Sequence, residues 1–385
     1  MSSKNHFDHI VLGVGSMGSA ACYYLAKRGH RVLGLEQFDI THEKGSHGGE
    51  SRIIRKAYFE HPDYIPLLER AYHLWRELEE QTDTQLYFKT GLLYGGPKNH
   101  SVLSGVKFAA KKYGIELHEL VVESSEGNLF RVPSDYELLF EPDAGFLLPE
   151  KAIRTFTNQA KVYGAEIRAN TKVQGWKLLD HAIQVDTTAG TFTCDRLLIT
   201  VGAWSGKLLP MVEPHLKVTR QVLSWYKPAF PSAFELGKFP CWLFAEPDCP
   251  GVFYGFPSMK GVSSETSNEV KVAYHHAGIK TDPDHVDRHV EKDDLALVHE
   301  FIRRHLPGGI GEMSESKTCL YSYSPDEHFV IDHLPGYKAK VCVAWGFSGH
   351  GFKFAPVVGE ILADLATTGQ TALPIGFLNA NRFEK

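Results

Sequence analysis

The stretch Phe7-Asp-His-Ile-Val-Leu-Gly13-Val-Gly15-Ser-Met-Gly18 decides the fold of this chain. Its apolar first half predicts a short buried strand, and residues 19–27 have the apolar spacing of a helix. Residues 31–35 predict a second strand, which Glu36 closes. This order is the opening of a dinucleotide-binding βαβ unit, which runs through a strand, a glycine-rich turn, a helix, a second strand and an acidic residue.

Each residue of this fingerprint has a physical task. Gly13 permits the tight turn, Gly15 lets the backbone approach a pyrophosphate, and Gly18 lets the helix pack closely on the strand. The helix N-terminus presents free N–H groups to the phosphates. Glu36 would accept hydrogen bonds from a ribose diol and repel a 2′-phosphate, so the sequence disfavours NADP. The fingerprint does not separate NAD from FAD, and an ordinary glycine turn is the alternative.

Composition and charge exclude several classes of partner. The chain has 385 residues, 43% of them hydrophobic, with 41 basic and 46 acidic residues and a net charge of −5. No long block of one charge sign favours nucleic acid or an acidic membrane surface. No stretch reaches the roughly 20 apolar residues of a membrane span, and the first residues lack the apolar core of a signal peptide. We therefore expect a cytoplasmic protein without nucleic-acid or membrane partners.

We also expect no bound metal. The six cysteines include no Cys-x-x-Cys pair, which disfavours a zinc ribbon or a thioredoxin-like motif. Residues 282–289, Asp-Pro-Asp-His-Val-Asp-Arg-His, resemble a cluster of metal ligands. They are more typical of the start of a helix, where acids favour the N-terminal turn.

The remaining chain alternates between helical and strand-like patterns. Residues 165–200 and 217–279 are rich in β-branched and aromatic runs typical of strands. Residues 341–345 predict a strand that a glycine loop and a helix follow. The other periodic segments predict helices over 64–80, 104–113, 151–163, 293–305 and 355–365.

A series of further motifs runs in order along nearly the whole chain. They are Gly45-Ser-His-Gly-Gly-Glu-Ser-Arg52-Ile-Ile-Arg55, Lys89-Thr-Gly91, Gly202-Ala-Trp204, Tyr254-Gly-Phe-Pro257, Lys271-Val-Ala-Tyr-His275, Cys319 with Tyr321, Asp326-Glu-His-Phe329 and Gly346-Phe-Ser-Gly-His-Gly-Phe-Lys353. Together these motifs resemble the monomeric sarcosine oxidase family, to which N-methyltryptophan oxidase and pipecolate oxidase are similar. The last of them is the most specific.

The resemblance implies a flavoenzyme. It implies FAD rather than NAD, attached covalently through Cys319. The implied reaction oxidises a small N-methyl or cyclic secondary amino acid, such as sarcosine, N-methyltryptophan or pipecolate, to an imine, with O2 reduced to hydrogen peroxide. The resemblance also implies a monomer. The expected fold class is α/β with two domains. A Rossmann-type FAD-binding domain (1–85, 150–216 and 320–385) is interwoven with a β-sheet-rich substrate domain (86–149 and 217–319).

The resemblance also assigns catalytic and substrate-binding roles. Arg55 and Lys353 match positions that hold the substrate carboxylate, because a carboxylate buried against an apolar flavin face needs paired cations. Lys271 matches a lysine above the flavin that promotes reaction with oxygen through fixed positive charge. Strand alternation puts His275 on the same face as Lys271, where we expect a catalytic role, and a satisfied structural histidine is the alternative. Arg52 matches a position near the flavin, where it acts electrostatically.

Aromatic, thiol and glycine residues complete the expected site. Tyr254 and Tyr321 resemble aromatics that pack on the substrate or hydrogen-bond its carboxylate, and ordinary core aromatics are the alternative. Cys319 must meet the flavin methyl as a thiolate, which needs an electropositive setting. Glycines in the loop 346–353 let the backbone approach a planar ring. The expected cofactor-binding residues are Gly13, Gly15, Ser16, Met17, Gly18, Glu36, Ser46, Ser51, Arg52, Gly202, Trp204, Cys319, Gly346, Gly349, His350, Gly351 and Lys353.

Two departures leave the substrate open. His47 is followed by Gly48, where the family often has a second histidine. The segment 240–252, which borders the substrate pocket in the family, is divergent. Three alternatives therefore stay open beside the oxidase: a flavin-dependent amino acid dehydrogenase with another electron acceptor, a fructosyl amino acid oxidase, and a non-catalytic flavin-binding protein. An NAD-dependent dehydrogenase is the remaining alternative.

Overall fold

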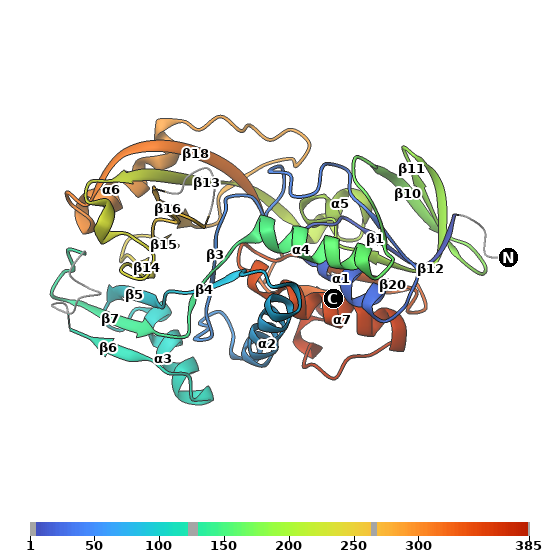
Figure 1. Ribbon diagram of the computed structural model, residues 1–385, viewed down its shortest axis with the longest axis horizontal. Coiled ribbons are helices and arrows are strands. Elements are labelled where there is room, and N and C mark those ends of the chain that lie inside the picture. The colour runs from blue at the N-terminus through green and yellow to red at the C-terminus, as the bar shows by residue number, and fades with distance from the viewer. Residues whose placement is uncertain (1–4, 122–129, 263–267, 384–385) are drawn as a thin grey trace.

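Two β-sheets lie at opposite ends of the molecule, with a group of helices between them (Figure 1). The computed structural model describes residues 5–121, 130–262 and 268–383. The N-terminal segment, where we expect no signal peptide, lies mostly outside these ranges. Within them, every helix is too short or too polar to cross a membrane.

The first sheet has eight strands and carries the dinucleotide fingerprint. Its path runs β10-β11-β12-β1-β2-β9, and β20 pairs with β12 and β19. β1 is parallel to β2 and β12, so the carboxyl ends of these strands share one edge. The side chains of Ile10, Val11 and Leu12 are fully buried, as in a parallel sheet that is covered on both faces. The strands are β1 (His6–Leu12), β2 (Val32–Leu35), β9 (Glu166–Arg168), β10 (Val173–Leu178), β11 (Ile183–Thr187), β12 (Gly190–Ile199), β19 (Val330–His333) and β20 (Val341–Trp345).

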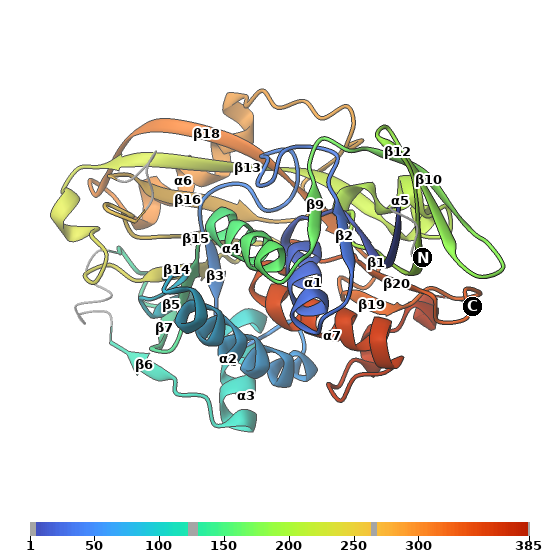
Figure 2. The ribbon, with the colours of Figure 1, turned by 45° about the vertical axis from the view of Figure 1, so that its right-hand side comes forward.

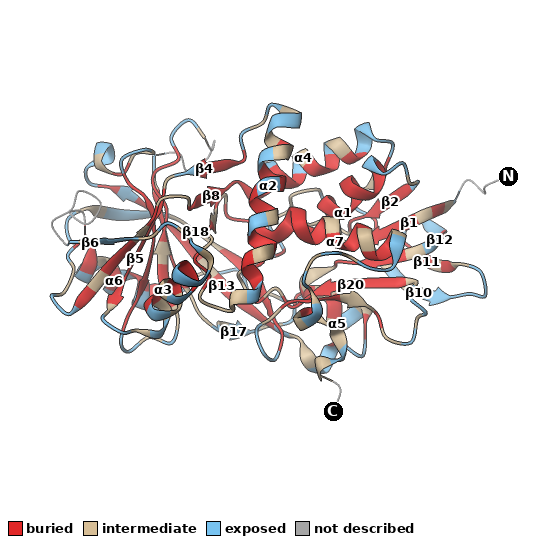
Figure 3. Cartoon of the chain, turned by 90° about the horizontal axis from the view of Figure 1, so that it is seen from below, coloured by how far each residue is buried: buried red, intermediate tan, exposed pale blue. Residues whose placement is uncertain are grey.

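Three helices pack together against this sheet. α1 (Ser16–Lys27) contacts both α4 (Pro149–Val162) and α7 (Ala355–Thr368) (Figure 2). The contact with α7 is close, because a Cβ at Gly359 would lie 2.5 Å from Cβ of Ala20. α1 is therefore buried along nearly its whole length (Figure 3). The other α-helices are α2 (Ile65–Thr82), α3 (Ser101–Tyr113), α5 (Ser205–Leu208) and α6 (Ala296–His305).

The second sheet has nine strands and stands at the other end. Its path runs β17-β13-β16-β15-β14-β5-β7-β6, and β18 pairs with the far side of β13. Buried aromatic residues on one face of this sheet pack against α6, among them Trp242 and Phe244. Its strands are β5 (Leu92–Pro97), β6 (His118–Leu120), β7 (Tyr136–Glu141), β13 (Lys217–Pro228), β14 (Cys241–Ala245), β15 (Val252–Gly255), β16 (Val270–His275), β17 (Ile279–Lys280) and β18 (Ile310–Tyr323).

A small third sheet and short helical turns complete the described part of the chain. The third sheet runs in the order β3 (Arg52–Ile54), β8 (Gly145–Leu147) and β4 (Tyr87–Lys89). β3 thus carries Arg52 into the middle of the molecule. The 3₁₀ turns are η1 (Pro62–Tyr64), η2 (Gly202–Trp204), η3 (Glu213–His215), η4 (Pro231–Ala233), η5 (Lys292–Leu295), η6 (Phe352–Phe354), η7 (Gly376–Leu378) and η8 (Ala380–Phe383).

One local expectation from the sequence is wrong. Residues 282–289 do not start a helix, because the next helical turn, η5, begins only at Lys292. The side chains of Asp282 and Asp284 pair instead with Lys207, at 2.8 and 3.2 Å from its Nζ. The acidic pattern suggested that these side chains stabilise a helix N-terminus. Their partner is instead a lysine from a distant segment. The domain boundaries expected from the sequence stay a prediction.

Candidate active site

A cavity of about 610 Å³ lies where the turn after β1 meets the loop after β20. Segments from both termini and from the middle of the chain line it. Of the residues expected from the sequence, its lining includes Gly13, Gly15, Ser16, Met17, Glu36, Ser46, Arg52, Gly202, Trp204, Tyr321, Gly349 and Gly351.

The glycine turn is shaped by close backbone packing. A Cβ at Gly18 would lie 1.9 Å from the carbonyl oxygen of Gly13, so the helix rests directly on the turn. Gly13 itself has a φ of +81°, in the left-handed region that favours glycine. The N-terminal end of α1 consequently opens onto the cavity, where its free N–H groups can meet an anion.

Glu36 stands at the end of β2 with both carboxylate oxygens engaged. The backbone N–H of Val14 donates to Oε2 at 3.0 Å, and that of Phe38 donates to Oε1 at 3.1 Å. The imidazole Nε2 of His42 lies 3.5 Å from Oε1. The side chain is buried and lines the cavity, so its remaining acceptor capacity faces the space where a ribose would lie.

His47 adds a buried polar atom at the same cavity. Its Nε2 finds no hydrogen-bond partner among the residues that the structure describes. Burial, helped by the neighbouring His42, lowers the pKa of His47 to about 3, so the ring is neutral. A buried polar atom without a partner is costly, and His47 therefore has hydrogen-bonding capacity to offer to a ligand in this cavity.

The loop after β20 closes the other side. Gly349 and Gly351 line the cavity, and a Cβ at Gly349 would lie 2.4 Å from the ring of Tyr321. Gly346 lies at the start of the loop with a φ of +69° and packs against Ser324 rather than the cavity. The loop then leads into η6 and α7, which begin with buried residues.

Cys319 is surrounded by cations just behind the cavity wall. It lies on β18 two residues before Tyr321, and both side chains belong to one buried cluster. Burial raises the pKa of its thiol, whereas the positive charges of Arg52, Lys271 and Arg288 oppose that shift. The positive charges favour a thiolate, but the effect of burial is larger and the pKa of the thiol stays above its ordinary value.

Arg52 and Lys271 are both fixed to backbone carbonyls of the same loop. The Arg52 guanidinium donates to the carbonyl oxygens of Ser46 and Gly48 at 2.8 and 2.6 Å. The Lys271 Nζ donates to the carbonyl oxygens of Gly49 and Ser51 at 2.6 and 3.1 Å. The expected residue Ser51 thus acts here through its backbone, and its hydroxyl lies 3.4 Å from the same Nζ.

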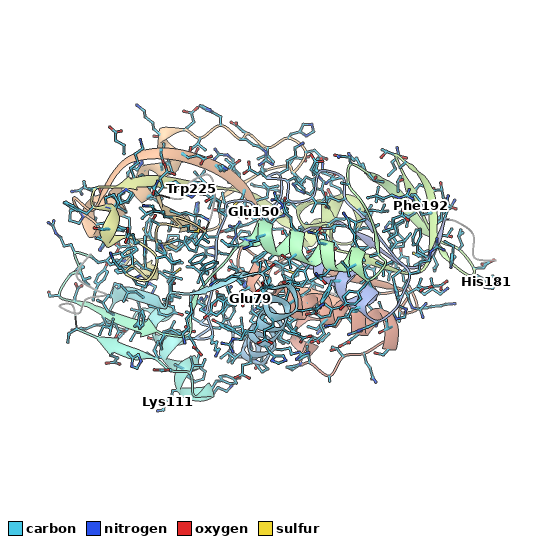
Figure 4. The ribbon with its side chains drawn as sticks, in the orientation of Figure 1. Glu79, Lys111, Glu150, His181, Phe192 and Trp225 are labelled. Carbon is cyan, nitrogen blue, oxygen red and sulfur yellow. The ribbon has the colours of Figure 1, made fainter. Side chains whose placement is uncertain are left out.

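The Lys271 ammonium is almost completely buried. Burial, with the neighbouring charge of Arg52, lowers the pKa of Lys271 to about 7. Its Nζ lies 5.4 Å from the ring of Trp225, which projects from β13 (Figure 4), and 4.9 Å from that of Phe256. The aromatic rings and carbonyl oxygens stabilise a charge that water does not reach.

Arg55 and Lys353, which are 298 positions apart by their numbers, meet around Tyr58. The Arg55 guanidinium lies 4.5 Å and the Lys353 Nζ 5.1 Å from the centre of the Tyr58 ring. Arg55 donates to Oε1 of Glu60 at 2.6 Å, and Lys353 donates to the carbonyl oxygen of His350 at 2.6 Å. The two cations expected to hold a carboxylate are therefore buried in one cluster.

The charges of this cluster shift one another's pKa values. Against the effect of burial, the positive charge of Arg55 holds the pKa of Glu60 down at about 2. Burial, together with Arg55, lowers the pKa of Lys353 to about 7. Glu60 is thus an internal carboxylate that occupies Arg55 in this structure, and its second oxygen finds no hydrogen-bond partner among the described residues.

The three remaining expected residues form an uncharged wall. The Nδ1 of His275 lies 3.3 Å from the hydroxyl of Tyr321, and Tyr254 packs in the same cluster. Burial lowers the pKa of His275 to about 4, so its ring is neutral near pH 7. Burial also raises the pKa of Tyr254 to about 12. Of the three, Tyr321 lines the cavity, where it can accept or donate hydrogen bonds without adding charge.

Sequence reasoning missed several residues at the cavity, and Asp284 and Lys207 form one linked group among them. Asp284 and Lys207 line the cavity, and the indole N–H of Trp204 donates to Oδ1 of Asp284 at 2.7 Å. Asp284 belongs to the acidic segment that suggested a helix start. A Trp after a Gly-Ala pair gave no sign of a carboxylate partner 80 positions away, so no local pattern pointed to this contact.

The sequence matches the family described as FAD dependent oxidoreductase over residues 8–365. The chain belongs to this family. It is therefore a flavoenzyme, and the expectation of FAD rather than NAD is confirmed, as is the α/β fold class. The residues at the cavity fit FAD, because Gly13 and Gly15 of the glycine turn, the buried Glu36 and the His47 ring line it. A Cβ at Gly13 would meet the backbone of Thr200 and Val201, and the Nε2 of His47 has no hydrogen-bond partner among the described residues.

This FAD-dependent oxidoreductase aligns over nearly its whole length with two curated relatives. It is 38% identical to the monomeric sarcosine oxidase of Bacillus sp. (strain NS-129), over 98% of this chain and 97% of that protein. It is 34% identical to the N-methyl-L-tryptophan oxidase of Yersinia pestis (strain Pestoides F), over 98% of this chain and 99% of that protein. The expected resemblance is thereby confirmed.

Solved structures share the fold. The open form of NikD, described as an unusual amino acid oxidase essential for nikkomycin biosynthesis, superposes with a TM-score of 0.85 at 25% identity, covering 98% of each chain. The L-proline dehydrogenase from P. horikoshii superposes with a TM-score of 0.82 at 20% identity, over 99% of this chain and 98% of that one.

Proposed function

We propose that this flavoenzyme oxidises a small secondary amino acid, of the N-methyl or cyclic type, to an imine and reduces O2 to hydrogen peroxide. The observation that carries the proposal is the meeting of Arg55 and Lys353 in one buried cluster. Two buried cations with one internal carboxylate leave positive charge that an anionic substrate can neutralise. The names of the sarcosine and N-methyl-L-tryptophan oxidases agree with an N-methyl amino acid.

Arg55 and Lys353 would bind the substrate carboxylate. A guanidinium grips a carboxylate through two parallel hydrogen bonds, and an ammonium adds a point charge. Glu60 holds Arg55 at 2.6 Å, so the incoming carboxylate must take over this partner. The exchange keeps the guanidinium paired and leaves the Glu60 carboxylate near the charge of Lys353, which also lowers its pKa. The cluster then holds two cations and two carboxylates.

The neutral wall would orient the amine and exclude water. His275, with its lowered pKa of about 4, stays uncharged near pH 7 and does not repel the two cations. Tyr254 and Tyr321 keep their hydroxyl protons, because burial raises both pKa values. The wall can therefore hold an amine in its neutral form by hydrogen bonds while its aromatic rings keep out water.

FAD, when bound, supplies the acceptor for the two electrons that leave the substrate. Ser16, Met17, Glu36 and Gly202 would hold its dinucleotide part, and Ser46 and Gly349 would lie nearer the reacting ring. Arg52 and Lys271 hold fixed positive charge beside Cys319. Such charge stabilises the negative charge that develops on oxygen as it is reduced.

Four finer points belong to this proposal. Cys319 would form the covalent link to the flavin, which its three neighbouring cations support. The enzyme would act as a monomer, in line with the name of the monomeric sarcosine oxidase. A division into an FAD-binding domain and a substrate domain at the boundaries expected from the sequence, and a cytoplasmic location, complete the proposal.

A panel assay tests the proposed reaction. The purified, flavin-loaded enzyme is given sarcosine, N-methyltryptophan, pipecolate or a fructosyl amino acid, and hydrogen peroxide is measured. We expect peroxide with at least one of the first three. Bleaching of the flavin by these substrates without peroxide would favour a dehydrogenase, and the absence of both signals with every substrate would reject the proposal.

A further inference from the structure

Tyr58 contacts both cations of the carboxylate-binding cluster, although no motif pointed to it. It lies four residues beyond the end of β3 and is almost completely buried. The centre of its ring is 4.5 Å from the Arg55 guanidinium and 5.1 Å from the Lys353 Nζ. A ring face attracts a cation and replaces part of the hydration that the cation loses on burial.

The Tyr58 hydroxyl reaches Lys353 by a second route. It lies 2.5 Å from Nδ1 of His350, and Nε2 of the same ring lies 3.2 Å from the carbonyl oxygen of Glu327. A carbonyl oxygen only accepts, so Nε2 carries the proton and Nδ1 accepts the hydrogen bond from Tyr58. The carbonyl oxygen of His350 in turn accepts from Lys353 Nζ at 2.6 Å.

Neighbouring rings fix the position of Tyr58. Tyr64 and Phe354 meet its ring edge-to-face, with centroids 5.3 and 5.6 Å away. These rings come from the segment before α2 and from η6, so the Tyr58 ring is held between an N-terminal and a C-terminal part of the chain. A ring fixed in this way can define the distance between two cations that belong to the same two parts.

We propose that Tyr58 positions both cations that receive the substrate carboxylate: its ring orients Arg55, and its hydroxyl, through His350, orients Lys353. The inference rests on the proposed function, because it concerns how that site binds its anion. Tyr58 does not touch the reacting atoms in this account. It is a positioning residue, and its loss changes carboxylate binding rather than the oxidation step.

Two variants separate the contributions of the ring and the hydroxyl. Tyr58→Phe keeps the ring and removes the hydrogen bond to His350, whereas Tyr58→Leu removes both. Tyr64→Phe is the matched control, because Tyr64 is equally buried in the same aromatic cluster and its hydroxyl contacts His328 and the backbone N–H of Phe329. All three are prepared with bound flavin, and flavin content and Tm are recorded for each.

The measurements are binding by calorimetry and turnover with the best substrate of the panel. The ligand is (methylthio)acetate, in which a thioether sulfur replaces the oxidisable amine of N-methylglycine. We expect Kd and KM to rise about 3- to 12-fold in Tyr58→Phe, within the range for one lost hydrogen bond between neutral groups. A further rise is expected in Tyr58→Leu, and kcat at saturation stays within threefold. Tyr64→Phe stays within twofold of wild type throughout.

Each outcome supports or overturns the inference. Kd and KM in Tyr58→Phe within twofold of wild type, or a kcat that falls more than threefold, overturns it. If Tyr58→Leu does not fold, the comparison of Tyr58→Phe with Tyr64→Phe still tests the inference. A wild-type enzyme that neither binds (methylthio)acetate nor oxidises an amino acid rejects the proposed function and this inference with it. Binding by wild type with an unchanged Tyr58→Phe rejects the role of Tyr58 alone.

Discussion

Replacing Lys353 by Met should weaken carboxylate binding by an amount that depends on pH. Met keeps most of the length and apolar packing of the side chain, and it removes the ammonium together with its charge and its hydrogen bond to His350. A charge-assisted hydrogen bond to a buried carboxylate contributes about 1.5–3 kcal/mol, which corresponds to about 10- to 150-fold in Kd. We expect this full loss at pH 6, where Lys353, with its pKa lowered to about 7, is charged before the ligand arrives.

The loss should shrink above pH 7. The bound carboxylate favours charged Lys353 and raises its pKa, so binding at pH 8 must first take up a proton. That step costs about 1.4 kcal/mol for each pH unit above the pKa of the free site. The wild-type affinity therefore falls as pH rises through about 7. The ratio of the variant's Kd to that of wild type drops roughly tenfold between pH 6 and pH 8, with about fivefold of that drop between pH 7 and pH 8.

Calorimetric titration with (methylthio)acetate at pH 6, 7 and 8 checks this prediction. Titrations in two buffers with different ionisation enthalpies give the proton uptake directly. Lys271→Met is the control, since the pKa of Lys271 is also lowered to about 7 but its ammonium is held by Gly49 and Ser51. The pH dependence should vanish in Lys353→Met and persist in Lys271→Met. A Lys353→Met enzyme that keeps the wild-type pH dependence would refute the reasoning.

Further substitutions test the flavin side of the account. In stopped-flow experiments, Lys271→Met should slow reoxidation by oxygen by at least tenfold and leave reduction by substrate within threefold; equal effects would remove its role. Cys319→Ala should release yellow flavin on acid precipitation, whereas wild type keeps it in the pellet; colour in neither pellet would exclude a covalent link. Gly18→Ala should lower flavin content and Tm, because the added Cβ would lie 1.9 Å from the carbonyl oxygen of Gly13; full loading at an unchanged Tm would contradict the packing argument.

Local chemistry made the cofactor end predictable. The turn Gly13–Gly18 and Glu36 belong to one βαβ unit, where each residue's task follows from backbone geometry over a short stretch. The last helix was predictable for the same reason, since a buried strand and a glycine loop precede it and α7 begins at Ala355. Short-range patterns of this kind are readable in a single sequence.

Partners set by tertiary approach were not predictable. Arg55 was expected to bind a carboxylate, but no local pattern indicated that Glu60 would form an ion pair with it. Nor did any local pattern indicate that the rings of Tyr58 and Phe59 would flank its guanidinium, at 4.5 and 4.3 Å. The acidic segment near Asp284 was misread because its true partner, Trp204, lies in another part of the chain. Charged and aromatic residues fit many local roles, and only the folded chain selects among them.

The central claim is that Arg55 and Lys353 together receive a carboxylate in a dry site, and one comparison tests it most directly. The value of kcat/KM is measured for an N-methyl amino acid that the enzyme oxidises and for the amine that lacks only its carboxyl group, for example N-methyltryptophan against N-methyltryptamine. Two charge-assisted contacts of about 1.5–3 kcal/mol each predict a preference of about 10²- to 10⁴-fold for the amino acid. A preference below tenfold would contradict the account.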